Sequence, residues 1–532
     1  MEKNVLWATI LSAVFLMGWY YFFMPAAQAP VSIPGTTSQT NVSQEDGKNL
    51  EPAFTKTTQL LDAKQSIPIQ PTERILENSK LKIALDSRGA SVKHWWIKED
   101  ERITLNGKEL VDLVNSGLSS SGADSFPLTT FPELQFKEVR YAKLGSGQIS
   151  SVWKAELDSG LEIEKSYFLG DERGSEEESY FSKMVLVFRN LSKNPIVLEN
   201  FKLGWQGGLG TTKSELKENQ SVTRLLAYPS PTKEVIKFKS GKENADFTWA
   251  GIDNRYYLFA FLPKQGQLDH ILTEKSKTNS GEVFLATDRL EISSGESKTY
   301  AFKLYGGPKG YTHLKELGLG LEHAVDFGYF GFLGKWALKV LNALKKTTGN
   351  YGWAIILLTC ALQLLLFPLS MKSYRSTAAM KKLQPKIQEL QKRYKEDAKR
   401  LNQEMLSLYK ESKTNPFGGC LPMILQIPVF WAFFTMLRNS YELRGTPWIF
   451  WIKDLSQHDP YYILPVVMGG GMFLQQKLSG SVGDPTQAKV MMFMPIIFTA
   501  MFLNFPSGLV LYWLTNSILS ISIQYWCTKK YA

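Results

Sequence analysis

Residues 353–370 read WAIILLTCALQLLLFPLS, a run of 18 positions without a charged side chain. A helix of about 20 apolar residues is needed to cross the hydrocarbon core of a bilayer. Similar runs occur four more times after this one and once near the N-terminus. The sequence therefore predicts a polytopic α-helical membrane protein with six spans. The predicted spans are residues 5–24, 353–370, 420–437, 461–476, 490–504 and 507–527.

The first predicted span allows two interpretations. Ala27-Gln28-Ala29 resembles a signal-peptidase site, which would make the segment a cleaved signal peptide. However, the apolar run is longer than the usual 7 to 15 residues of such peptides. Pro30 directly after the site should also hinder cleavage. We therefore expect residues 1–24 to form an uncleaved signal anchor, with the signal peptide as the alternative.

Residues 25–320 contain no run long enough to span a bilayer. Residues 25–75 are rich in Pro, Ser, Thr, Gln and Asn, which is typical of a flexible tether. From residue 76 onward, short β-prone runs alternate with turn residues, as in LKIAL at 81–85 and KMVLVFR at 183–189. This pattern predicts an antiparallel β-sandwich domain over residues 76–320.

The pattern changes to a helical period before the second span. Trp336, Leu341 and Leu344 fall on one face of a helix, and Lys335 and Lys339 fall on another. We expect an amphipathic helix within residues 321–350 that lies in the membrane interface. Packing against the β-domain is the alternative.

The distribution of charge predicts the orientation of the chain. The sequence has 61 Lys+Arg and 50 Asp+Glu, a net charge of +11. Residues 371–415 hold 12 basic and 5 acidic residues, or +7, whereas residues 438–460 hold three of each. By the positive-inside rule, the first of these loops is cytoplasmic and the second is outside. With six spans, both termini are then cytoplasmic, including the tail at 529–532, and the β-domain is outside.

The basic loop at 371–415 also has a helical pattern that predicts a two-helix hairpin. Its charge could form a docking surface for an anionic partner such as ribosomal RNA or lipid headgroups. The alternative is that the charges only fix topology and solubility. The candidate contact residues are Lys381, Lys382, Lys386, Lys392, Arg393, Lys399 and Arg400.

The chemistry of the predicted spans is neutral. None of the six contains Asp, Glu, Lys, Arg or His in its interior, which argues against an ion-coupled transporter or pump. The three cysteines and five histidines lack the spacings of a metal site, and we expect no cofactor.

Uncharged polar residues recur within the spans at helical spacing. Thr359 and Gln363 share one face, Trp513 and Asn516 share another, and Gln426 lies in the third span. These residues could line a wet, uncharged groove. They could equally be the hydrogen-bonding contacts that are common between membrane helices.

Several motifs in the second half of the chain resemble the YidC membrane protein insertases, over residues 320–528 and in the same order. The anchor, the outside β-domain and the interfacial helix resemble the Gram-negative version of that family. The matching stretches are LQPKIQEL at 383–390, NPFGGCLPMILQIPVF at 415–430, DPYYILPVVMG at 459–469, FMPIIFTAMF at 493–502 and FPSGLVLYWLTN at 505–516.

The resemblance implies a five-helix insertase core over residues 351–528 in a bacterial inner membrane, with a periplasmic β-domain and no enzymatic activity. It implies that nascent membrane proteins enter a hydrophilic groove and leave it into the bilayer. The Sec translocon, the ribosome and anionic lipids are the implied partners. The groove residues would be Thr359, Gln363, Gln426, Tyr512, Trp513 and Asn516.

One position departs from the family. Relatives usually carry a groove arginine five residues before the proline that ends the second span, and this position is Gln363 here. We therefore expect hydration and hydrogen bonding to suffice without a fixed groove charge. The alternative functions are a solute transporter or channel, and a membrane-tethered carbohydrate-active enzyme whose chemistry would reside in the β-domain.

Overall fold

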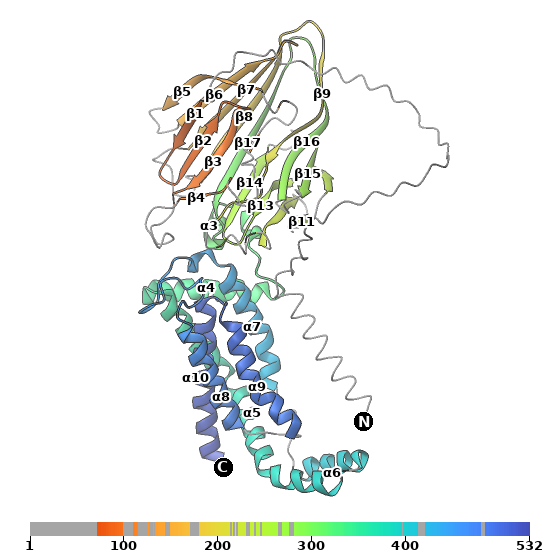
Figure 1. Cartoon of the computed structure of the whole chain (residues 1–532), viewed down its shortest axis with the longest axis vertical. Helices are drawn as coiled ribbons and strands as arrows, with labels where there is room; N and C mark the ends of the chain where they lie inside the picture. Colours follow the sequence, from red (N-terminus) through yellow and green to blue (C-terminus); the bar gives the residue numbers. More distant parts are fainter. Residues whose placement is uncertain are drawn as a thin grey trace, which may run out of the picture. The chain divides into compact units, whose positions relative to one another are not determined.

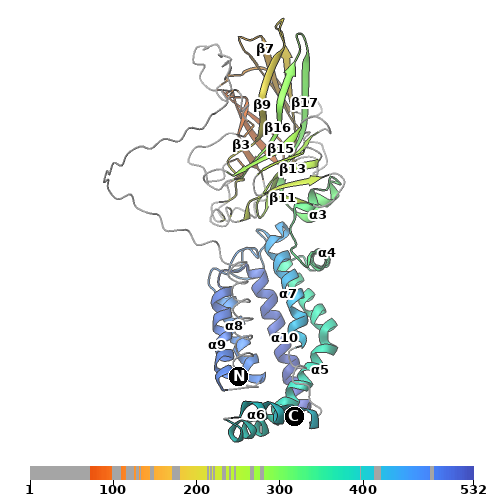
Figure 2. The same ribbon diagram turned by 90° about the vertical axis from the view of Figure 1, so that its right-hand side faces the viewer.

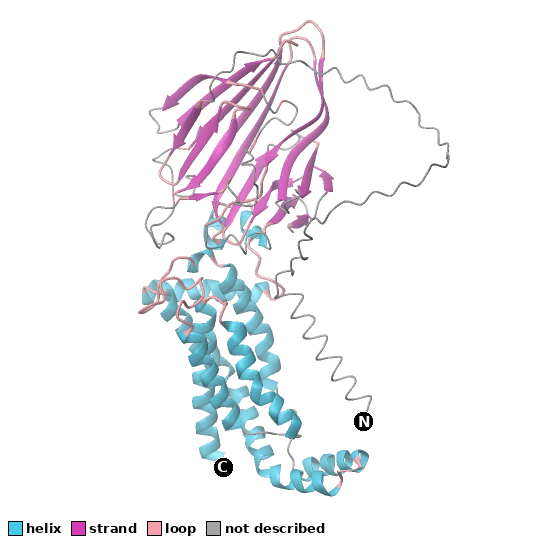
Figure 3. Ribbon diagram, viewed as in Figure 1, coloured by secondary structure: helices cyan, strands magenta, loops and turns pink. Residues whose placement is uncertain are grey.

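Strands and helices occupy different stretches of the chain in the computed structural model (Figure 1, Figure 3). The predicted signal anchor at 1–24 and residues 25–71 of the predicted tether lie outside the described residues. The structure describes residues 72–531 except 99–109, 115–124, 127–130, 132–133, 144–148, 171–179, 213–214, 216–218, 220–221, 230–234, 239–240, 245–246, 264–268, 276–280, 396, 413–420 and 480–484.

The described β-rich part consists of one nine-stranded and two four-stranded sheets, and every strand pair in them is antiparallel. The strand orders are β11-β10-β13-β14-β17-β8-β7-β6-β5, β1-β2-β3-β4 and β12-β15-β16-β9. The predicted antiparallel β architecture is thus confirmed. The strands are β1 Glu73–Glu77, β2 Leu81–Asp86, β3 Ser91–Ile97, β4 Val111–Asp112, β5 Lys137–Lys143, β6 Ile149–Glu156, β7 Leu161–Leu169, β8 Phe181–Asn190, β9 Ile196–Trp205, β10 Arg224–Pro229, β11 Ile236–Phe238, β12 Gly241–Asn244, β13 Phe247–Asp253, β14 Tyr257–Pro263, β15 His270–Lys275, β16 Gly281–Ile292 and β17 Ser297–Pro308.

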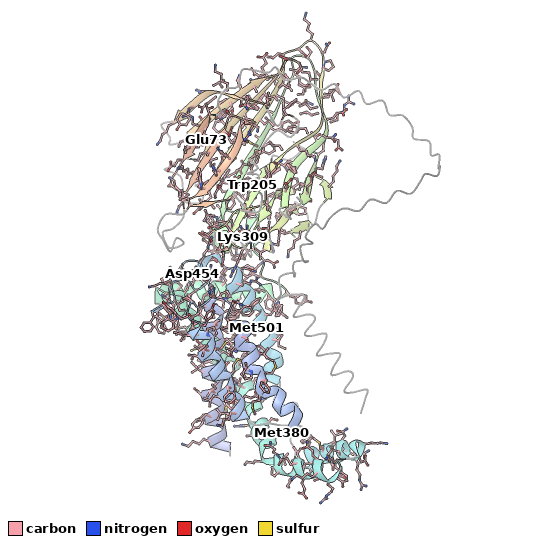
Figure 4. All side chains as sticks on the ribbon, viewed as in Figure 1. Glu73, Trp205, Lys309, Met380, Asp454 and Met501 are labelled. Atoms are coloured by element: carbon pink, nitrogen blue, oxygen red, sulfur yellow. The ribbon has the colours of Figure 1, made fainter. Side chains whose placement is uncertain are left out.

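Aromatic side chains join the three sheets into one core. Trp205 of β9, which is labelled in Figure 4, stacks on Phe259 of β14 with ring centroids 3.9 Å apart. Trp95 of β3 meets the same Phe259 ring edge-on at 5.5 Å. Phe188 of β8 and Phe201 of β9 form another edge-on pair at 5.4 Å. Because aromatic rings bury large apolar areas, these contacts contribute much of the stability of this core.

Lys165 is a cation that is fully buried in this β-rich part. The Lys165 side chain on β7 faces inward, where its Nζ donates hydrogen bonds to the carbonyl oxygens of Gly89 at 2.7 Å and Phe126 at 2.6 Å. Burial lowers the pKa of Lys165 to about 7. This lysine therefore ties β7 to the segments at 89–90 and 125–126, and the fold disfavours its charged form.

The buried lysine predicts how stability depends on pH. Its pKa is lower in the folded chain than in the unfolded chain, so the unfolded chain binds more protons between about pH 7 and pH 10. The free energy of unfolding of the β-rich part should therefore rise with pH across that window. In Lys165→Met, urea unfolding followed by tryptophan fluorescence should lose this contribution. The control Lys154→Met, at a half-buried lysine of β6, should keep it, and equal pH slopes in the two variants would contradict the assignment.

The helices follow the β-rich part. One described stretch, Tyr351–Met380, is long and apolar enough to cross a membrane, and Met492–Phe502 is a shorter apolar helix. A helix covers most of each predicted segment at 420–437, 461–476, 490–504 and 507–527, but the count of six spans stays a prediction. The helices are α3 Tyr311–Glu316, η2 Leu321–Ala324, α4 Gly331–Thr348, α5 Tyr351–Arg393, α6 Ala398–Glu411, α7 Leu421–Asn439, η3 Tyr441–Leu443, α8 Ile463–Ser479, α9 Pro485–Phe502 and α10 Ser507–Tyr531.

The helix that contains the second predicted span does not end at Pro368. Pro368 and Pro385 both lie inside α5, which continues for 43 residues to Arg393. A proline removes one backbone hydrogen bond, and membrane helices tolerate this where neighbouring groups compensate. The first helix of the predicted hairpin is therefore the continuation of α5, and α6 is its second helix (Figure 2).

A helix lies within the predicted amphipathic segment at 321–350, namely α4, and small residues make up much of its buried face. The buried residues are Gly334, Ala337, Leu338 and Leu341, and this helix packs against α5 and α7. Trp336, which the helical spacing places on the apolar side, is 53% exposed. The small residues at 334 and 337 allow close helix packing, which leaves the larger ring outside.

Candidate functional site

The candidate site is built on α10, which contacts α5, α7 and α8 (Figure 2). Tyr512, Asn516 and Ser520 are spaced by four residues, so they lie on one face of α10. Tyr512 is buried and Asn516 is half-buried. The Gln426 amide of α7 donates a hydrogen bond from Nε2 to the Tyr512 hydroxyl at 2.9 Å. The predicted site residues Gln426 and Tyr512 are therefore in contact.

A second polar contact joins α5 to the same face of α10. The Gln363 amide donates from Nε2 to the Ser520 hydroxyl at 3.4 Å, and the Gln363 residue is only 7% exposed. The two contacts lie eight residues apart along α10, which is about 12 Å of helix. Thr359 does not bond across the interface, because its hydroxyl donates to the Ile355 carbonyl of its own helix at 2.7 Å.

Trp513 belongs to an aromatic cluster rather than to the polar contacts. Its ring lies 4.8 Å from that of Phe430 on α7 and 5.3 Å from that of Phe502 on α9. The structure thus places the predicted polar residues next to an apolar wall. All the hydrogen-bonding groups in these contacts are neutral amides and hydroxyls, which can bind peptide groups of a polypeptide but supply no charge.

Sequence reasoning missed part of this polar face. Ser373 on α5 and Gln524 on α10 are buried as well, at 4% and 3% exposure. Gln524 continues the four-residue spacing from Ser520, so the periodicity of the sequence could have identified it. Ser373 does not continue the four-residue spacing of Thr359 and Gln363 on α5, so that spacing does not identify it.

A buried carboxylate, that of Asp459, holds the segment between α7 and α8 in place. Asp459, between α7 and α8, accepts hydrogen bonds from the Trp451 indole at 2.9 Å and from the Leu464 amide at 2.7 Å. The Ser507 amide at the start of α10 donates to the Gln457 carbonyl at 2.7 Å. These contacts fix the segment between α7 and α8 against the end of α10 that lies nearest to Tyr512.

A buried cation joins this segment to the β-rich part. Arg444 donates to the Glu215 carboxylate at 2.9 Å and to the Tyr257 hydroxyl, and its side chain is 2% exposed. Nearby, burial opposes the ionisation of Asp326, but Lys237 and Arg224 hold the pKa of its carboxyl at about 2. Charged contacts therefore connect the two parts outside the helices.

The basic residues predicted on the hairpin lie at the other end of α5 and on α6. The Lys381 side chain lies outside the described part. Arg393 pairs with Glu389 at 3.4 Å, and both side chains are more than half exposed, so the pairing leaves the charge accessible. The exposed members are Lys382, Lys386, Lys392, Arg393, Lys399 and Arg400.

The contact between Gln426 and Tyr512 predicts a measurable coupling. In a double-mutant cycle of Gln426→Leu and Tyr512→Phe, the interaction energy should be about 0.6 kcal/mol, the average for hydrogen bonds between membrane helices. The measurement is thermal unfolding in nanodiscs. The matched cycle of Gln426→Leu with Ser520→Ala joins residues that the structure does not pair, and should give no coupling. Equal coupling in both cycles would contradict the assigned contact.

Comparison with known proteins covers the whole chain. A family model described as "60Kd inner membrane protein" matches residues 343–532, and one described as "YidC periplasmic domain" matches residues 75–340. The Membrane protein insertase YidC of Endomicrobium trichonymphae is 40% identical over 544 residues, covering 100% of this chain and 98% of that relative. The protein of the same name from Syntrophus aciditrophicus (strain SB) is 35% identical over 556 residues, covering all of both chains.

A solved structure is also similar. It is described as an active YidC insertase crystal structure with the first transmembrane domain resolved, and it is 20% identical with a TM-score of 0.39. The match covers 86% of this chain and 94% of that one. A score this low does not establish a shared arrangement, so the family assignment rests on the sequence relatives.

Proposed function

The chain belongs to the YidC family of membrane protein insertases, and on this premise we propose that it inserts its clients through a neutral hydrophilic groove built on α10. The clients of a YidC insertase are nascent membrane proteins, and the protein is an insertase rather than an enzyme. The transporter and carbohydrate-active alternatives are not favoured, since the full-length relatives carry the insertase name.

One observation supports the groove: a single polar face of α10 meets an amide from α5 and an amide from α7. In the proposal, Gln363, Gln426 and Asn516 offer donors and acceptors to the polar segment of a client, together with the Tyr512 hydroxyl. Trp513 forms the apolar wall beside them. Thr359 contributes a small buried surface, because its hydroxyl is already bonded within α5.

The energies allow an exchange of partners. A hydrogen bond between membrane helices contributes about 0.6 kcal/mol on average, so a client that replaces Ser520 or Tyr512 as a partner overcomes little resistance. Burial of the client's apolar segment in lipid contributes about 25 cal/mol per Å². The second quantity is far larger over a whole span. Insertion can therefore proceed without ATP once the polar segment of the client is bound in the hydrated groove.

The proposed topology follows the sequence charges. We place six spans in the bacterial inner membrane, with both termini cytoplasmic and the β-rich domain in the periplasm. In this arrangement α4 lies at the periplasmic surface of the inner membrane, and the hairpin lies in the cytoplasm. The proposed boundaries are 1–24 for the anchor, 25–75 for the tether, 76–320 for the β-domain, 321–350 for the interfacial helix, 351–528 for the core with its hairpin at 371–415, and 529–532 for the tail.

The proposed partners follow from charge. The exposed basic residues on α6 and on the last turns of α5 support binding of a ribosome or of anionic lipid headgroups. Lysines and arginines attract phosphate without reading sequence, which suits a surface that receives many different clients. The Sec translocon, which the family resemblance implies, is proposed as a further partner.

Insertion into proteoliposomes that contain only this protein tests the proposal. A small single-span client synthesised in their presence should become protease-protected above the level of empty liposomes. Protection at that background level would contradict autonomous insertion. Gln363→Arg should keep most of the activity, because a long arginine side chain can extend its charge toward water and still donate to Ser520.

The matched control is Leu358→Arg. Leu358 lies five residues before Gln363 in α5 and is 2% exposed. A charge there has no polar partner, so folding and insertion should both fail. Loss of insertion in a well-folded Gln363→Arg protein would show that a neutral residue is required at this position.

A further inference from the structure

Four neighbouring strands of the nine-stranded sheet, β7, β8, β17 and β14 (Figure 1), carry a row of residues that lie directly opposite one another. Phe168 of β7 pairs with Lys183 of β8, Lys183 pairs with Lys303 of β17, and Lys303 pairs with Leu262 of β14. Directly opposite residues of antiparallel strands point to the same face. Both lysines are exposed, and Phe168 and Leu262 are half-buried. The row is therefore apolar at both ends and doubly positive in the middle.

Two like charges at directly opposite positions destabilise a sheet. Within the described chain, neither Lys183 nor Lys303 forms an ion pair, and both ammonium groups lie over aromatic rings. On the same face, a few residues away, basic side chains are paired with a carboxylate. Lys154 pairs with Glu164 at 3.4 Å, and Arg189 pairs with the same Glu164 at 3.1 Å. Among the residues that the structure describes, no carboxylate therefore offsets the positive charge of these two lysines.

The row borders a hollow of about 340 Å³. Its apolar lining includes Phe168, Leu262 and Pro263, and the two lysines form its charged side. The Lys303 Nζ lies 4.0 Å from the centre of the Phe181 ring, and the Lys183 Nζ lies 5.7 Å from that of Phe168. Ammonium groups above aromatic rings stay close to the apolar surface. The hollow therefore suits a ligand that carries a negative charge next to an apolar group.

The hydrogen bonding of the sheet limits how such a ligand can bind. β7, β8, β17 and β14 all lie inside the sheet, with a paired strand on each side. Their backbone groups are already used, so a ligand cannot add as a further strand. It has to insert side chains into the hollow. A simple inorganic anion would gain nothing from the apolar walls, whereas a polypeptide can supply a carboxylate and an adjacent apolar side chain together.

We propose that this hollow binds an acidic segment of polypeptide in which a carboxylate lies between Lys183 and Lys303 and a neighbouring aromatic or aliphatic side chain packs on Phe168 and Leu262. The segment would belong to the part of a client that is translocated across the membrane. This assignment of the client rests on the proposed function, which places the β-domain on the side where that part emerges. The hollow then holds the polar end of a client while its apolar segment enters the bilayer.

The test is calorimetric titration of the full chain in phosphatidylcholine nanodiscs with the capped peptide GSEFEGS. This peptide should bind, and the uncharged peptide GSQFQGS should bind about tenfold more weakly, as expected for the loss of two partly exposed charge pairs. The variant with Lys183→Gln and Lys303→Gln should lose affinity for GSEFEGS by a similar factor. The control Lys154→Gln, a lysine of the same face that is already ion-paired, should keep it.

Other results would overturn the proposal. Equal binding of the two peptides, or equal loss in the control and the double variant, would indicate unspecific charge attraction. Displacement of the peptide by equimolar inorganic phosphate would indicate a simple anion site. The thermal midpoint of the double variant should not fall, because removing facing like charges relieves repulsion. A lower midpoint would contradict the premise.

The binding measurement needs no insertion, so the two proposals can fail separately. If the protein inserts clients normally in proteoliposomes but does not bind the peptide, the hollow is not a client site. The groove proposal is then unaffected. Peptide binding without insertion would support the hollow and remove the groove mechanism.

Discussion

The helical part of this protein depends on one constraint: an amide or hydroxyl among apolar side chains must have a hydrogen-bond partner, because leaving it unpaired costs several kcal/mol. α10 meets this constraint for two neighbouring helices, through Tyr512 with Gln426 and through Ser520 with Gln363. The N-terminal end of α10 is tied by Ser507 to the segment between α7 and α8. That segment in turn holds the buried Arg444, whose partners lie in the β-rich part.

The strength of these contacts differs with their surroundings, and so does the role that each one suits. Arg444 and Glu215 are a buried charge pair, and removing one partner of such a pair leaves an uncompensated charge that costs about 3–5 kcal/mol. This contact suits a permanent junction. The neutral contacts of α10 are several times weaker and are easily exchanged for contacts with water or a polypeptide. The proposed groove therefore lies where the bundle can change partners, and the junction lies where it cannot.

Sequence periodicity predicted the elements better than their partners. The alternation around residues 81–85 is found in β2, and the predicted segment that contains Trp513 and Asn516 is the helix α10. Periodicity could not show that Gln363 meets Ser520, which is 157 residues away, or that Arg444 meets Glu215, which is 229 residues away. Periodicity also could not show that α5 continues past Pro368, or that Trp336 lies outside the packed face of α4. The row containing Lys183 and Lys303 depends on strand register, which turns and packing decide together.

The central claim is that the polar face of α10 forms a groove that water can reach, and not only a dry set of contacts between helices. The most direct measurement is the reaction of Asn516→Cys with a membrane-impermeant maleimide, in a chain whose three native cysteines are replaced by serine. We expect labelling when the reagent is added on the cytoplasmic side and none when it is added on the periplasmic side. A cysteine at this position that reacts from neither side would show that the face is dry and would contradict the proposed groove.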